Sequence, residues 1–196
     1  MYSSLGYLSP SELCNMPSSR LVLLIGLITA IPAGVYGQVG GDTIYWSPDR
    51  ALHWADFQAT PMPLSPYAAI TTAGIFYSLT YSPKSYRTRV YCYFLKSRSW
   101  SRSKDRAQLL KHEQGHFDIT ELYARKLQLA FAAYHYHFAT VSADLKNIFA
   151  GINAEKARMN EQYDRETDLS ANAAQQTRWN KKIAQALKQE RSTTAP

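Results

Sequence analysis

Residues 112–138 read HEQGHFDITELYARKLQLAFAAYHYHF, and this stretch decides the class of fold. Its large apolar residues recur at spacings of three, four or six, which favours one buried face of an α-helix. Between residue 103 and Pro196 the sequence holds no proline, and its only glycines are Gly115 and Gly151. The second half of the chain is therefore predicted to be helical, with the first helix continuing unbroken through Phe138.

Two later stretches predict where this helical half is divided. "TVSAD" at 140–144 and "LSAN" at 169–172 supply helix-capping and turn residues. Between them an apolar stripe runs from Leu145 to Tyr163, and "AAQQTRWNKKIAQALKQE" at 173–190 follows. Three helices are therefore expected, and residues 191–196 are predicted to be a disordered tail.

The part before residue 100 is predicted to be mostly β-structure. Four stretches contain β-branched and aromatic residues and are bounded by turn residues: "TIYW" (43–46), "LHWADF" (52–57), "AAITTAGIFYSLTY" (68–81) and "TRVYCYFL" (88–95). They predict three or four mostly antiparallel strands. The expected fold is α+β, a small N-terminal sheet packed on C-terminal helices, in one domain spanning residues 38–190.

The N-terminus has the pattern of a secretory signal. Arg20 precedes an apolar run at 21–31 and then small residues, and the run is too short to span a bilayer comfortably. Residues 1–37 are predicted to be a signal peptide that leaves Gln38 as the mature terminus, with Met16 as a possible start. The expected location is secreted or periplasmic. The alternative is an uncleaved anchor, the one case in which the protein would be attached to a membrane.

Charge and cysteine content narrow the expected partners. The formal net charge is +7, but Lys and Arg are dispersed along the chain and no nucleic-acid motif is present. A solvated basic surface is the favoured interpretation, and weak attraction to anionic surfaces or acidic substrates is the alternative. Cys14 precedes the predicted cleavage site, so Cys92 would remain alone and an internal disulfide could not form.

"HEQGH" at 112–116 is the stretch that carries chemistry. Histidines four residues apart lie on one face of a helix and can bind one metal ion. Glu113 can reach a water beside that metal and act as a general base, which completes an H-E-x-x-H zinc site. His112 and His116 also continue the apolar stripe of the helix, so two core histidines without metal are the alternative. The pairing with Glu113 favours zinc.

A catalytic zinc site needs a third protein ligand. His135 would lie nearly 30 Å from His116 along an unbroken helix, so "YHYHF" at 134–138 is interpreted as an aromatic helix end. If the second helix folds back about residues 140–144, the segment opposite His116 lies near Thr167. Carboxylates occur there at Asp164, Glu166 and Asp168. Asp164 and Glu166 are the preferred ligands, and Tyr163 is a possible oxyanion donor because of its location.

Several segments resemble a family of predicted secreted bacterial zinc proteases, domain-of-unknown-function family 922. "LLKHEQGHFDITELYARKL" (109–127) carries the resemblance, with support from "LHWADF", "AAITTAGIFY", "SW", "YDRETD" and "QQTRW", over roughly residues 44–187. The resemblance implies a zincin-like metallopeptidase fold with a peptide or protein substrate, and it favours Asp164. The family pattern is Tyr-Asp-x-x-Thr-x-His. In this chain it corresponds to residues 163–169, and Leu169 stands in place of the final histidine.

Three functions are therefore weighed. The favoured one is a zinc-dependent peptidase in which Glu113 takes a proton from the attacking water and passes it to the leaving amine. The second is a non-catalytic envelope protein whose degenerate zinc site serves stability or partner binding, as Leu169 suggests. The third is a metal-free helical scaffold. The sequence does not indicate an oligomeric state.

Overall fold

A computed structural model describes the backbone of residues 41–193 and the side chains of residues 41–189. The predicted signal peptide, residues 1–37, lies outside the described residues, as do residues 194–196. Within the described part, no helix is both long and apolar enough to cross a membrane.

The β-structure forms two antiparallel sheets in the first half of the described chain. The larger has the order β1-β4-β3, from β1 (Thr43–Tyr45), β4 (Ser85–Leu95) and β3 (Ala73–Ser82). Strands β3 and β4 form a long hairpin in which Ser82 pairs with Ser85. The smaller sheet joins β2 (Ala69–Ile70) to β5 (Trp100–Ser101). These strands confirm the predicted antiparallel N-terminal sheet.

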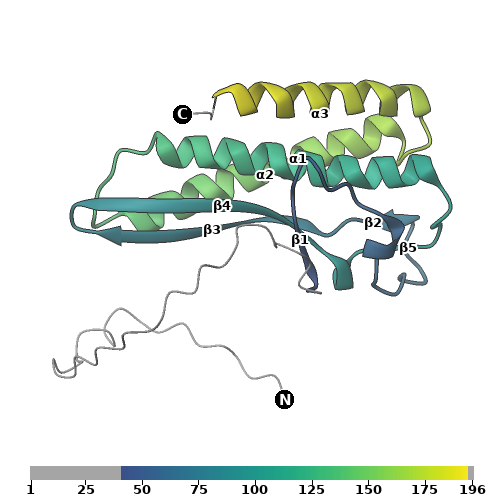
Figure 1. The fold of residues 1–196 in the computed structure, drawn as a ribbon, viewed down its shortest axis with the longest axis horizontal. Helices are drawn as coiled ribbons and strands as arrows, with labels where there is room; N and C mark the ends of the chain where they lie inside the picture. Colours follow the sequence, from purple (N-terminus) through teal and green to yellow (C-terminus); the bar gives the residue numbers. More distant parts are fainter. Residues whose placement is uncertain (1–40, 194–196) are drawn as a thin grey trace, which may run out of the picture. The chain divides into compact units, whose positions relative to one another are not determined.

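Three long helices follow: α1 (Ala107–Ala132), α2 (Val141–Thr167) and α3 (Ala173–Thr193). Helix α1 contacts the hairpin as well as α2 and α3, so it lies at the centre of the packing (Figure 1). The α+β class predicted from the sequence is therefore confirmed. Helix α3 continues to Thr193, into the segment that was predicted to be a disordered tail.

Both sides of α1 are buried. Toward the sheet, the rings of Phe117 and Phe131 pack against Phe94 and Tyr77 at centroid distances of 5.8 and 5.0 Å. Toward α2 and α3, a second core is formed by Ile119, Tyr163, Trp179 and Ile183. Helix α1 is thereby fixed on both sides, and this gives the side chains between the two cores a defined position.

The prediction of a strand at 52–57 was wrong. Trp54–Asp56 form a short 3-10 helix (η1) instead. Asp56 explains the difference, because its carboxylate accepts the backbone N–H of His53 at 2.8 Å and pairs with Arg50 at 2.7 Å. Such a local side-chain bond to the backbone competes with strand pairing.

The prediction of one strand over 68–81 was also too simple. The chain leaves the small sheet after Ile70 and enters the large one at Ala73. Thr72 lies between the two sheets and is held there by two hydrogen bonds. Its N–H donates to Ser99 Oγ at 2.9 Å, and its hydroxyl donates to the Arg98 carbonyl at 2.8 Å.

The first helix ends at Ala132, six residues before the predicted Phe138. Beyond it, the Tyr86 hydroxyl of the hairpin donates to the carbonyls of Phe131 and Tyr134. The Tyr134 hydroxyl donates to Asp144 at 2.6 Å. Side chains from the hairpin and from α2 thus bind the segment at the end of α1 in place of a further helical turn. His135 and His137 lie exposed in the loop that follows.

Candidate metal centre

The two histidines of HEQGH lie one turn apart on the face of α1 that meets α2. His112 is 3% exposed, and the two Nε2 atoms are 3.2 Å apart. The rings are perpendicular, with centroids 4.8 Å apart. The i, i+4 spacing thus brings both imidazoles to one point, as the sequence predicted.

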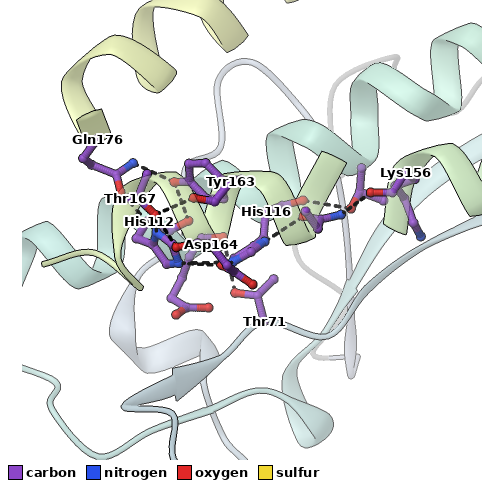
Figure 2. A network of polar contacts seen from close by, with 11 residues as sticks. Thr71, His112, His116, Lys156, Tyr163, Asp164, Thr167 and Gln176 are labelled. Carbon is purple, nitrogen blue, oxygen red and sulfur yellow. Dashed lines mark hydrogen bonds and ion pairs between the residues drawn. The ribbon is translucent and has the colours of Figure 1, made fainter. Parts of the chain in front are cut away.

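Asp164 of α2 completes this group (Figure 2). Its Oδ1 lies 3.1 Å from His112 Nε2 and 2.9 Å from His116 Nε2. Ligand atoms about 2.0–2.2 Å from one tetrahedral zinc ion lie roughly 3.3–3.6 Å from one another. The three atoms therefore need to separate only slightly to hold an ion, and among the described residues this is the group of His, Cys and carboxylate side chains arranged to do so.

The other ring nitrogen of each histidine has an amide partner. His112 Nδ1 lies 3.1 Å from Gln176 Oε1, and His116 Nδ1 lies 2.7 Å from Asn160 Oδ1. An amide oxygen only accepts hydrogen bonds, so both Nδ1 atoms are the donors. In the neutral imidazole each Nε2 then carries a lone pair that points at the other ligands.

The amide orientations follow from their remaining bonds. The Asn160 Nδ2 group donates to the Lys156 carbonyl at 3.0 Å. The Gln176 Nε2 group donates to the Tyr163 hydroxyl at 2.6 Å, and that hydroxyl donates to the His112 carbonyl at 3.1 Å. Each chain of bonds ends on a backbone carbonyl, which can only accept. The oxygens of both amides must therefore face the histidines.

Three lone pairs thus converge from two Nε2 atoms and one carboxylate oxygen. The pKa shifts of His116 and Asp164 also favour positive charge beside the Asp164 carboxylate. Burial disfavours a charged His116, but the hydrogen bond with Asp164 and the negative charges of Asp164 and Glu113 together outweigh burial and raise the pKa of the imidazole. Burial also opposes ionisation of Asp164, yet hydrogen bonds with both histidines hold its pKa well below the usual range. The group could therefore hold a cation.

Glu113 lies beside this group and is 3% exposed. It lines the same cavity as His112, His116 and Asp164, and burial raises the pKa of its carboxyl group. Thr71 donates its hydroxyl to the Glu113 carbonyl at 3.3 Å, which links the segment after β2 to α1. A carboxylate with a raised pKa beside a metal site is suited to accept and return a proton.

The cavity has a volume of about 310 Å³. Helix α1 lines it through residues 109–120, the segment at 67–73 lines one side, and α2 lines the other. Leu169 and Lys156 also line it, together with the three candidate ligands and Glu113. The cavity is therefore a space in which a ligand can contact the metal group and Glu113 together.

Two of the predicted site residues are placed elsewhere. Glu166 accepts hydrogen bonds from Gln162 at 2.7 Å and from the Trp179 indole at 2.7 Å, and it is not part of the group. Tyr163 is fully buried, and its hydroxyl proton is used by the His112 carbonyl. Its ring stacks on His112 at a centroid distance of 4.6 Å. Tyr163 therefore positions His112 and is not turned toward the cavity as an oxyanion donor.

Two hydrogen-bond partners of the histidines, Asn160 and Gln176, were not predicted from the sequence. Asn160 lies one turn before Asp164 on the same face of α2, so helical spacing offered a signal. Gln176 lies on α3, and no local pattern distinguishes it from Gln175. Its position depends on the packing of α3 against α1.

Comparison with known proteins agrees with part of this picture. Residues 95–172 match the model of a family described as "Bacterial protein of unknown function (DUF922)". Over this stretch the chain is similar to that family. The match contains the HEQGH stretch, Asp164 and Leu169, so the resemblance seen in the sequence is supported there. Neither the curated proteins nor the solved structures gave a match.

Proposed function

We propose that this protein is a zinc-dependent peptidase with a zincin-like site, which hydrolyses peptide bonds outside the cytoplasm, as a secreted or periplasmic protein. The observation that carries the proposal is the convergence of His112 Nε2, His116 Nε2 and Asp164 Oδ1 beside a buried Glu113 in an open cavity. His112, His116 and Asp164 would hold the metal.

Zinc bound there would lower the pKa of a water molecule to about 7 and polarise a peptide carbonyl. The chain's own residues would supply the rest of the mechanism. Glu113 would take a proton from the attacking water and deliver it to the leaving amine. Its raised pKa supports both transfers, because a carboxylate that ionises easily is a weak base. Gln176 and Asn160 would hold the two imidazoles with their Nε2 atoms toward the cavity.

A second function is favoured by Leu169. This residue lines the cavity at the position where the resemblance to the family leads us to expect a histidine, and it can neither bind metal nor transfer a proton. A non-catalytic envelope protein that uses its zinc site for stability or partner binding would fit this replacement.

Glu113→Gln distinguishes the two functions. The amide keeps the size of the side chain but is not a base, so zinc content should stay at about one ion per chain while cleavage of a peptide library falls by ~10² to 10⁴-fold. Zinc is measured by elemental analysis and cleavage by mass spectrometry. Glu161→Gln on the exposed face of α2 is the matched control and should change neither quantity.

Each outcome has a defined meaning. Cleavage by Glu113→Gln at the wild-type rate would refute the role of Glu113. A wild-type protein that holds zinc and cleaves nothing in the library would favour the non-catalytic function. A protein that binds no zinc would refute both.

A further inference from the structure

The two ends of the cavity differ in chemistry. The cavity-lining residues of α1 extend from Leu109 to Thr120, which is roughly 16 Å along the helix. Helices α1 and α2 are antiparallel, because His112 meets Asp164 while His116 meets Asn160. The end beyond His112 is therefore apolar, with Leu109 and Leu169. The end beyond His116 is polar, with Thr120 and Lys156.

Among the described residues that line this polar end, Lys156 has the one charged side chain. In Figure 2 it lies on the far side of His116 from His112. Its side chain is half-buried, and no carboxylate of the described residues lies within 4.0 Å of its ammonium group. The nearest acidic residue in sequence, Glu155, pairs with Lys126 instead. Lys156 is thus a cation in a cavity wall without a carboxylate partner among the described residues.

This arrangement has an energetic consequence. Burial lowers the pKa of Lys156, which means that part of the hydration of its ammonium group is already lost. Among the described residues no acid compensates for that loss. A bound anion would compensate for it, and charge-assisted hydrogen bonds are stronger than neutral ones. The polar end of the cavity is therefore suited to an anion.

We propose that Lys156 binds a carboxylate of the substrate peptide, two to four residues from the bond that is cleaved. Residues 156 and 164 are roughly 12 Å apart along α2. An extended peptide covers that distance in about three to four residues, and the flexible lysine stem widens the range. The inference rests on the proposed peptidase function and adds to it the class of substrate.

The carboxylate could be an acidic side chain or the C-terminus of the peptide, and the test separates these sources. One set of acetylated and amidated octapeptides carries a single Glu at each position in turn, and a matched set carries Gln. A third peptide has neither residue and a free C-terminus. Binding is measured by calorimetry on the zinc-loaded Glu113→Gln protein, in which the peptides remain intact.

Glu peptides should bind roughly tenfold or more tightly than their Gln partners at one or two positions if the carboxylate is a side chain. The free C-terminus alone should show this gain if it is the source. Lys156→Met should abolish the preference, Lys156→Arg should retain it, and raised salt should weaken it. Lys146→Met, an exposed lysine on the same helix, is the control and should leave it unchanged.

The result is independent of catalysis, so the two proposals can fail separately. Equal binding of acidic and neutral peptides, or a preference that survives Lys156→Met in a protein with an unchanged melting curve, overturns the carboxylate site even if the wild type cleaves peptides. A Lys156-dependent preference in a wild-type protein that cleaves nothing supports the carboxylate site and contradicts the peptidase function.

Discussion

At the residue scale, Gly115 explains how Tyr163 can support the candidate metal centre. A Cβ atom at this position would lie 2.2 Å from the Tyr163 hydroxyl oxygen and 2.7 Å from its Cζ atom. The absence of a side chain lets the tyrosine approach α1 closely enough to donate to the His112 carbonyl. The glycine in HEQGH is therefore required by packing and is not a free position in the motif.

Gly115→Ala is expected to lower the free energy of unfolding by about 1–3 kcal/mol, since Tyr163 is fully buried and has no room to move away. It should also weaken zinc binding, because a displaced Tyr163 disturbs His112. Denaturant unfolding and competition with a chelator measure the two effects. Gly151→Ala is the control. Nothing lies within 4 Å of its added Cβ, so this change should stabilise α2 by up to ~1 kcal/mol. A stable Gly115→Ala protein would contradict the packing argument.

Leu169 lies in an unusual turn at the mouth of the site. Asp168, Leu169 and Ser170 all have positive φ angles, of 48°, 48° and 82°. The N–H of Leu169 donates to the Asp164 carbonyl at 3.0 Å, which ties this turn to a ligand residue. Leu169 is 44% exposed and lines the cavity. The backbone thus places residue 169 in the wall of the cavity that holds the candidate metal ligands, although its side chain is apolar.

Leu169→His is expected to tighten zinc binding tenfold or more, because it adds an imidazole beside the three ligands. Histidine also adopts positive φ more readily than leucine, so the turn should tolerate the change. Affinity is measured by competition with a chromogenic chelator. Leu129→His on α1 places the same residue type outside the cavity and should have no effect. Unchanged affinity for Leu169→His would mean that the side chain turns away from the ion.

At the scale of elements, the sequence predicted what depends on local periodicity. The helical spacing of apolar residues correctly indicated α1, α2 and α3, and the fold-back of α2 brought Asp164 within reach of the histidines. The missed features depend on contacts between distant segments. Helix α1 ends early because Tyr86 of the hairpin donates to the Phe131 carbonyl near its end, and 68–81 divides because Thr72 binds Ser99. No pattern within either segment contains this information.

The same distinction applies to the candidate site. His112, Glu113 and His116 could be predicted because one helical turn determines their relative position. The choice between Asp164 and Glu166 could not be made from spacing alone. It depends on how α2 is rotated about its axis, which is fixed by Tyr163 packing beneath His112 and by Trp179 binding Glu166 from α3.

At the scale of the whole molecule, the export prediction concerns residues that the structure does not describe. The first described strand begins at Thr43, so removal of residues 1–37 would take away no described residue. Since the apolar run at 21–31 fits a cleaved signal better than a membrane span, mass spectrometry of the native protein should find a mature terminus near Gln38. Cytosolic protein that retains Met1 or Met16 would exclude export by this signal.

Such a mature chain would depend for stability on its core and on the metal ion that we propose it binds. Cys92 is the one cysteine among the described residues, and it is buried beneath α1 with its thiol donating to the Phe117 carbonyl at 3.8 Å. Burial raises the pKa of that thiol well above its usual value, so it is a poor nucleophile. A metal ion would instead connect α1 to α2 through two histidines and one aspartate. His112 and Asp164, which it would join, are 52 residues apart in the sequence.

Removal of the metal should therefore destabilise the whole domain. At a free zinc concentration of 100 times the dissociation constant, binding adds about 2.7 kcal/mol to the free energy of unfolding, which a strong chelator would remove. The melting temperature, followed by circular dichroism, should fall by several degrees with chelator and recover with added zinc. His112→Ala should melt at the lower temperature with or without chelator, whereas His135→Ala, in the exposed loop after α1, should behave as wild type. A melting temperature that does not respond to chelator in the wild type would show that the three convergent ligands hold no ion that contributes to stability.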